Sequence, residues 1–247
     1  MLKSILNKFY IAWVLFVFTS FMLFFLPGII IPGFFGPRAR AVTFFFMKAW
    51  SWVFSKLNVI TYQMVDRHKI KKGKAYIYLS NHTSYLDLPG IAMTIRGQFR
   101  PLAKKELLKI PVFGWITRVC CVVVDRSSNE SRRKSMQHLK DTLALGINIL
   151  IFPEGTQNQS KEPLQPFYDG AFRIAIETQQ PIMPMVVIGA GRLMPPKTFF
   201  IQHGKIKIVL GDEITTTGLE LSDVDKLKEQ VRNVMLQMLE SHSTIQK

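Results

Sequence analysis

Residues 75–87 read AYIYLSNHTSYLD. The apolar run Ala75–Leu79 has the length and the aromatic and β-branched content of a buried strand. The polar residues that follow it interrupt the strand, and a helical pattern begins near Asp87. The stretch therefore predicts a strand, a turn and a helix in succession. This succession is typical of an α/β fold.

Outward from this stretch, the chain after residue 70 alternates short apolar runs with segments of helical periodicity. Further strands are expected at Val119–Val124, Ile147–Phe152, Met183–Ile188 and Lys205–Leu210. Helices are expected at Ser131–Leu145, Tyr168–Thr178 and Ser222–Glu240. The fold class that follows is α/β, with a mixed, largely parallel sheet flanked by helices.

The whole chain is both apolar and basic. Of its 247 residues, 48% are hydrophobic, and 32 lysines and arginines outnumber 17 acidic residues, for a formal net charge of +15. A balance of this kind predicts a polyanionic partner, either nucleic acid or an anionic membrane surface. The mean hydropathy of +0.15 is high for a nucleic-acid-binding chain, so we expect a membrane lipid surface and no nucleic acid.

Much of the charge and the apolar character lies in the N-terminal third. Residues 1–75 contain 11 lysines and arginines and one acidic residue, Asp66. Phe9–Leu26 is uncharged and about long enough to reach across a hydrocarbon core, and Pro-Gly pairs that begin at Pro27 interrupt the pattern after it. Val42–Leu57 has the aromatic and basic composition of a helix at a membrane interface.

Three interpretations of this region compete: a cleaved signal peptide, a single-pass anchor, and a broken helical hairpin that dips into one leaflet. No small-residue cleavage site follows the apolar run, which argues against the first. Cations on both sides of the run fit two ends on the cytoplasmic face of an (inner) membrane. We expect a membrane-anchoring helical hairpin in residues 1–60 and an α/β domain in residues 61–247.

Ligands of α/β proteins gather beyond the carboxyl ends of the strands. His82 and Asp87 follow the first predicted strand. Within one helix they would point about 140° apart, so they meet only if His82 lies in the turn and Asp87 in the first helical turn. A carboxylate that orients a neutral imidazole produces a general base. The alternative is structural, because Ser84-x-x-Asp87 also fits a helix capping box.

Two further groups follow predicted strands. Glu154, Gly155 and Thr156 offer a carboxylate, a flexible backbone and a hydroxyl, or they form an ordinary surface turn.

Arg126, with Lys104 and Lys105 upstream, could hold a phosphate, or these cations are ordinary solvated charges.

Motifs of several other enzyme classes do not occur in the sequence. It has two adjacent cysteines, Cys120 and Cys121, and no Cys/His spacing typical of zinc sites. It has no G-x-S-x-G, Walker A, H-E-x-x-H or G-x-G-x-x-G motif. The cysteine pattern therefore excludes a disulfide framework and a structural zinc site.

Taken in order, these blocks resemble the glycerolipid acyltransferases, and most closely the 1-acylglycerol-3-phosphate (lysophosphatidic acid) acyltransferases, over roughly residues 60–215. The family pattern NHxSxxD is matched by Asn81, His82, Ser84 and Asp87. The later blocks are matched by Val122–Arg126, by FPEGT at residues 152–156, and by Pro181–Met185.

The resemblance implies an acyltransferase domain in residues 61–247, with His82 as general base and Asp87 as its orienting residue. It also implies substrate-binding roles for Lys104, Lys105, Arg126, Glu154, Gly155 and Thr156. Acyl-CoA or acyl-carrier protein would be the donor, a lysophospholipid the acceptor, and phosphatidic acid the product. The resemblance implies no metal and no bound cofactor.

The sequence departs from the family pattern at Gln157, where the family usually has Arg, and at Cys120, often Gly in the family. The change at Gln157 leaves another lysolipid acceptor open. Outside this class, the alternatives are a membrane-bound thioesterase and a non-catalytic module that binds anionic lipid or nucleic acid.

Overall fold

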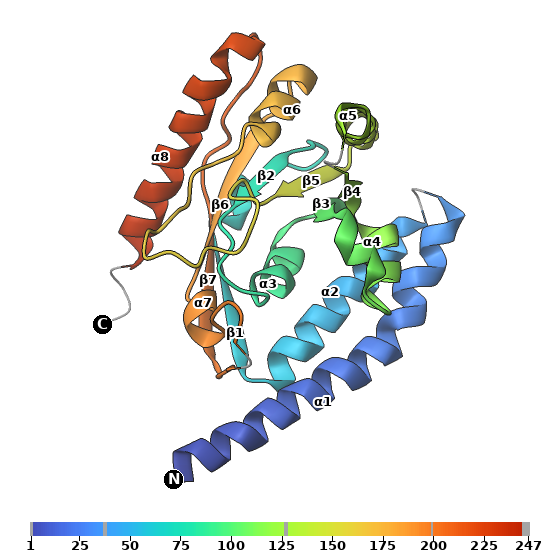
Figure 1. Ribbon diagram of the computed structural model, residues 1–247, viewed down its shortest axis with the longest axis vertical. Coiled ribbons are helices and arrows are strands. Elements are labelled where there is room, and N and C mark those ends of the chain that lie inside the picture. Colours follow the sequence, from blue (N-terminus) through green and yellow to red (C-terminus); the bar gives the residue numbers. More distant parts are fainter. Residues whose placement is uncertain (1, 37–38, 126–127, 199, 244–247) are drawn as a thin grey trace.

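A computed structural model describes residues 2–36, 39–125, 128–198 and 200–243 (Figure 1). Within them lies a seven-stranded sheet of order β1-β7-β6-β2-β5-β3-β4. The strands are β1 (Ile60–Val65), β2 (Ile77–Ser80), β3 (Phe99–Lys104), β4 (Val122–Val124), β5 (Asn148–Ile151), β6 (Ile182–Ile188) and β7 (Gly204–Leu210). The expected mixed, largely parallel sheet is confirmed.

All neighbouring strands are parallel except β6 and β7, which are antiparallel. Strands β2 to β6 therefore end at one edge of the sheet, and β1 and β7 begin there. We call this edge the carboxyl edge. It is the edge at which ligands of α/β sheets bind.

Helices cover both faces of the sheet (Figure 1). They are α1 (Leu2–Ile30), α2 (Arg40–Leu57), α3 (Asp87–Thr94), α4 (Phe113–Cys120), α5 (Asn129–Ala144), α6 (Gly170–Thr178), α7 (Ala190–Leu193) and α8 (Val224–Ser243). Short 3₁₀ turns are η1 (Ile31–Phe35), η2 (Arg67–Lys69), η3 (Lys105–Lys109) and η4 (Leu221–Asp223). Each expected helix is present to within a few residues.

Alternate side chains of β2 belong to two hydrophobic clusters, one on each face of the sheet. Ile77 and Leu79 belong to the hydrophobic cluster formed with α5, α6 and α8. Tyr76, just before the strand, and Tyr78 belong to the cluster formed with α1, α2 and α3. Successive side chains of a strand point to opposite faces, so four consecutive residues serve both cores.

The N-terminal region folds as a helical hairpin of α1 and α2, joined through η1. The hairpin packs onto the sheet: the rings of Phe44 and Phe99 lie 5.2 Å apart, and Lys48 Nζ donates to the Ile95 carbonyl at 2.7 Å. The proposed boundary near residue 60 thus crosses a shared hydrophobic cluster, and the division into two domains stays a prediction.

The expected helix break at Pro27 is wrong, because α1 continues to Ile30. A side chain at Gly28 would come within 2.6 Å of the Phe46 ring, so this glycine lets α1 and α2 approach closely. We infer that this contact offsets the hydrogen bond lost at the proline. Among the described residues, the segment Leu6–Phe35 is long and apolar enough to cross a membrane, by length and composition. Its exposed apolar surface indicates membrane association.

One strand prediction needs correction. The apolar run Val119–Val124 was expected to be a single strand, but Val119 and Cys120 end α4 and only Val122–Val124 form β4. Val119 and Cys120 are buried against Ile29 of α1, so tertiary packing overrides their β propensity.

Candidate active site

The turn after β2 brings His82 and Asp87 into contact. His82 lies in the turn and Asp87 is the first residue of α3. Imidazole Nδ1 and carboxylate Oδ2 are 2.8 Å apart. The same oxygen accepts the backbone N–H groups of Thr83 at 2.8 Å and Ser84 at 2.9 Å. Asp87 is buried, so a single carboxylate both shapes the turn and orients the imidazole.

This arrangement fixes which imidazole nitrogen is free. An ionised carboxylate can only accept a hydrogen bond, so Nδ1 of His82 carries the proton and Nε2 presents a lone pair. The ring of Phe152 stacks on the imidazole, with centroids 4.1 Å apart and planes inclined by 18°. The His82 side chain is 15% exposed, so a substrate can reach it. The pair has the geometry of an oriented general base.

Glu154 supports the turn from the end of the neighbouring strand β5. Its Oε1 accepts the His82 backbone N–H at 3.1 Å, and its Oε2 accepts the Gln165 N–H at 2.8 Å. Burial raises the pKa of the Glu154 carboxyl above its usual range. Both oxygens bind backbone, so the structure gives Glu154 a positioning contact with His82.

The two residues after Glu154 differ in exposure. Gly155 has φ +72°, and a Cβ there would come within 2.8 Å of the Tyr168 ring, so both conformation and space call for glycine. Thr156 is exposed at the surface.

Other contacts at the turn were not predicted from the sequence. Asn81 fixes the end of β2 to β6: its amide donates to the Val187 carbonyl at 2.9 Å and accepts the Val187 N–H at 2.7 Å. The Asn158 N–H donates to the His82 carbonyl at 2.6 Å. The sequence identified Asn81 as part of the NHxSxxD pattern, but nothing nearby in sequence identified its partner strand.

Two of the candidate phosphate-binding cations, Lys104 and Lys105, lie further along the carboxyl edge. Lys104 is exposed at the end of β3, which is separated from β2 by β5 alone. Lys105 Nζ lies 2.7 Å from Asp125 Oδ2. Arg126 lies outside the described residues. With strands about 4.8 Å apart, β3 ends about 10 Å from β2. The structure thus brings both lysines to the edge that holds His82, without contact between them and the imidazole.

Gln157 occupies the position at which the resemblance expects an arginine. Its amide Nε2 is buried and has no hydrogen-bond partner within the described residues. An unsatisfied buried donor is costly, so a bound acceptor group here would be favourable.

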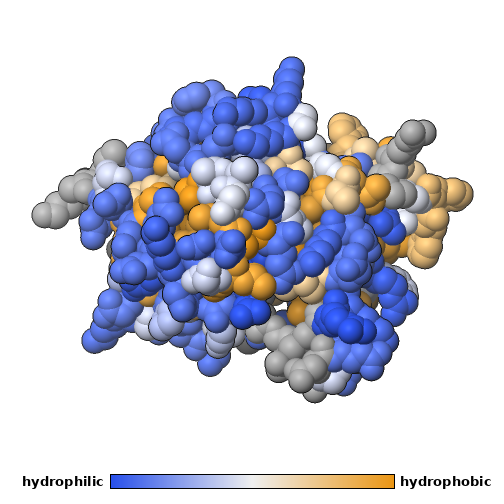
Figure 2. Space-filling view, turned by 90° about the horizontal axis from the view of Figure 1, so that it is seen from above, coloured by the Kyte–Doolittle hydropathy of each residue, from blue (hydrophilic) through white to orange (hydrophobic). Residues whose placement is uncertain are grey.

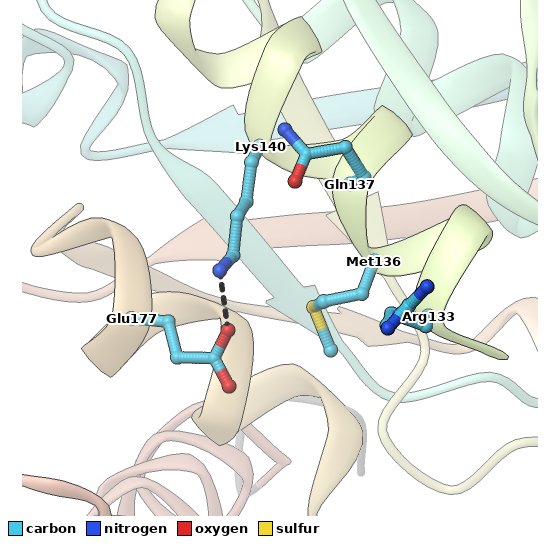
Figure 3. Close-up of a pocket in the computed structure, with 5 residues that line it drawn as sticks. All are labelled: Arg133, Met136, Gln137, Lys140 and Glu177. Atoms are coloured by element: carbon cyan, nitrogen blue, oxygen red, sulfur yellow. Dashed lines mark ion pairs between the residues drawn. The ribbon is translucent and has the colours of Figure 1, made fainter. Parts of the chain in front are cut away.

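A hollow elsewhere on the surface, of about 290 Å³, lies between α5 and α6 (Figure 3). Its lining includes the ion pair between Lys140 and Glu177, 2.8 Å apart. It lies on the face of the sheet covered by α5 and α6, away from the turn of His82. No group of three His, Cys, Asp or Glu side chains within the described residues is arranged to hold a metal ion.

Comparison with known proteins shows the family to which the chain belongs. The acyltransferase family model matches residues 61–188, just over half of the chain. An uncharacterized acyltransferase of Schizosaccharomyces pombe is 29% identical over 194 residues, 76% of this chain and 68% of that protein. The human 1-acyl-sn-glycerol-3-phosphate acyltransferase alpha is 32% identical over 181 residues, 72% of this chain and 63% of that protein. The chain therefore belongs to the acyltransferase family.

The fold has a solved counterpart in the crystal structure of the 1-acyl-sn-glycerophosphate acyltransferase from Thermotoga maritima. The TM-score is 0.84 at 20% identity, over 99% of both chains. This match confirms the fold, including the N-terminal hairpin. The mammalian relatives are longer, and the chain spans less than two thirds of their length.

Proposed function

We propose that this enzyme transfers a fatty acyl group from a thioester, acyl-CoA or acyl-carrier protein, to the free hydroxyl of a lysophospholipid. The proposed acceptor is 1-acylglycerol 3-phosphate, which gives phosphatidic acid. The observation that carries the proposal is the 2.8 Å contact between His82 and Asp87 at the carboxyl edge. The names of the mammalian relatives support the choice of acceptor.

In the proposed reaction, His82 Nε2 takes the proton of the acceptor hydroxyl while Asp87 stabilises the imidazolium. The acceptor oxygen attacks the thioester carbonyl carbon and forms a tetrahedral intermediate. The C–S bond then breaks, and the departing thiolate takes the proton from the imidazolium. The products are the ester and the free thiol, so no acyl-enzyme, metal or cofactor is needed for the atoms to balance.

The backbone of the turn limits how the oxyanion is stabilised. The N–H of His82 donates to Glu154, and the N–H groups of Thr83 and Ser84 donate to Asp87. These three donors are occupied by carboxylates. We therefore assign the oxyanion to donors outside residues 82–84, with the positive imidazolium adjacent to it.

The acceptor phosphate would bind Lys104 and Lys105 of the carboxyl edge, together with Arg126, whose role follows from the resemblance. Lys105 already faces Asp125, so a phosphate would compete with that exposed ion pair, which costs little to break. Glu154, Gly155 and Thr156 would shape the acceptor side of the site. The hairpin would hold the enzyme on the cytoplasmic face of the inner membrane, where both lipid substrates are available.

The test is transfer of a radiolabelled acyl chain from acyl-CoA to a panel of lysolipids and glycerol 3-phosphate, with enzyme in vesicles. His82→Ala should lower the rate of transfer about 10²- to 10⁴-fold. The matched control is His138→Ala, because His138 is an exposed histidine on α5, away from the site. Near-normal turnover by His82→Ala would reject the mechanism. Acyl release without any acceptor would identify a thioesterase instead.

A further inference from the structure

A second apolar surface lies outside the hairpin, on the segment that joins β3 to β4. Its members are three large side chains that are exposed: Ile110 (47%), Phe113 (37%) and Trp115 (58%). We call these three residues the α4 patch. Three neighbouring large apolar side chains left in water are costly, which indicates that something covers them.

The backbone between Ile110 and Trp115 forms a tight, strained turn. The Phe113 N–H donates to the Pro111 carbonyl at 2.6 Å, closing a three-residue turn about Val112. Val112 has φ +63°, which is rare for a β-branched residue. Gly114, two residues after Val112, lies so close to Leu108 that a Cβ would come within 2.3 Å of the Leu108 carbonyl oxygen. Strain of this kind persists only where the surrounding structure enforces it.

The α4 patch continues the apolar surface of the hairpin. Trp115 lies one turn before Val119 on the same face of α4, and Val119 packs against Gly33 of η1. Phe34 and Phe35 of η1 are both exposed. Figure 1 places α4 beside the turn between α1 and α2, and in Figure 2 apolar surface projects at that same end of the molecule.

The charges around the patch suit an anionic surface. Lys109 and Arg118 precede and follow it in the sequence, both are exposed, and neither forms an ion pair with another described residue. Lys104 and Lys105 stand just upstream, at the carboxyl edge. Tryptophan beside apolar side chains, with flanking cations, is the composition of a membrane interface.

We propose that the α4 patch is a second membrane contact, which inserts into the headgroup region of an anionic phospholipid bilayer beside η1. The patch follows directly from the end of β3, so this contact holds the carboxyl edge against the bilayer. It acts independently of the chemistry at His82.

The test is depth-dependent quenching in the full-length chain. Ile110→Cys carries an environment-sensitive fluorophore, and the protein is reconstituted into phosphatidylcholine–phosphatidylglycerol vesicles with or without brominated acyl chains. The control label is Leu145→Cys, an exposed apolar site next to α5 on the other face of the sheet. The unsubstituted chain, treated with the same reagent, measures labelling of Cys120 and Cys121.

Brominated lipid should remove about half of the emission at position 110, because interfacial side chains lie about 5–10 Å into the headgroup boundary. Emission at position 145 should not change. The same result with His82→Ala would separate this contact from the proposed function. Equal emission at position 110 with both lipids overturns the proposal. Self-quenching between labelled copies would instead identify a protein interface and also overturn it.

The role of the flanking cations is tested by letting anionic and neutral vesicles compete for the protein. Lys109→Gln and Arg118→Gln should each lower the preference for anionic over neutral vesicles about fivefold, since one cation near an anionic surface has about that effect. Lys226→Gln, an exposed lysine on α8, is the matched control. An unchanged preference in the first two variants would contradict the proposed role of the flanking cations.

Discussion

Asp87 Oδ2 accepts three hydrogen bonds, from His82 and from two backbone N–H groups of the turn. Asn in place of Asp87 offers one accepting oxygen without charge, and cannot hold the imidazole and the turn equally well. Asp87→Asn should therefore lose transfer activity to within about tenfold of His82→Ala, and the double variant should be no worse than the more severe single, because the pair acts as a unit. The measurement is kcat for all three variants, and additive losses would argue against a coupled pair.

The Glu154 carboxyl provides a pH test. Burial raises its pKa in the folded chain, so its contribution to stability is fully present below the unfolded pKa and is lost as pH rises through the folded value. Glu154→Gln cannot ionise, so it should flatten the dependence of unfolding temperature on pH above the ordinary glutamate pKa of about 4.3. The measurement is thermal unfolding in detergent across that range. Parallel curves for the two proteins would show that Glu154 does not titrate in this way.

Gln157 can be tested by restoring the arginine expected from the resemblance. A guanidinium in place of the buried, unpaired amide would give a phosphate-bearing acceptor a charge-assisted hydrogen bond. Gln157→Arg should lower KM for 1-acylglycerol 3-phosphate by about tenfold with little change in kcat, which corresponds to about 1.4 kcal/mol of binding. A gain for an acceptor without a free phosphate monoester would point to a different headgroup site.

At the residue scale, the sequence predicts some contacts of the site and not others. The contact between His82 and Asp87 could be predicted because only five positions separate them. The contacts of Asn81 with Val187 and of Glu154 with His82 could not, because each joins residues brought together only by strand order.

At the scale of elements, long periodic segments were predicted well and mixed ones were not. Strands β1 and β3 were missed: β3 contains Arg100 and Pro101, which obscure its pattern, and Arg100 is nevertheless buried and lies over the Phe44 ring. The last residues of α4, Val119 and Cys120, are β-branched or small, so the sequence pattern indicates a strand there. In both places, long-range packing decides the structure.

The segment before α4 gives a stability prediction. Gly114→Ala places a Cβ against the Leu108 carbonyl, so the variant should lose about 1–3 kcal/mol of unfolding free energy. Gly170→Ala is the control, since nothing lies within 4 Å of its added Cβ. The measurement is chemical unfolding in detergent, and an equal effect at both glycines would contradict the close approach at Gly114.

At the scale of the whole molecule, the hairpin carries exposed apolar surface and also contributes side chains to the core under the sheet. Deleting residues 1–39 removes α1 and η1, and with them Val14 and Val17 of the core under the sheet, whereas deleting residues 1–60 also removes Phe44 and Phe54 of that core. Both truncated chains should lose much of their membrane association, and the longer deletion should expose more of that core and aggregate more readily. Sedimentation with membranes and thermal unfolding separate the two effects. Sedimentation of either truncation as complete as that of the full chain would contradict the anchoring role.

The order of strands has a consequence for biosynthesis. β1 pairs only with β7, with Ile60 opposite Gly204, so the first strand to leave the ribosome waits for the last one before it can join the sheet. Contacts between such distant residues form slowly. The apolar hairpin just before β1 is meanwhile complete and uncovered. The proposed anchor is therefore available to a bilayer before the sheet closes, so the order of strands favours folding of the α/β domain at the membrane.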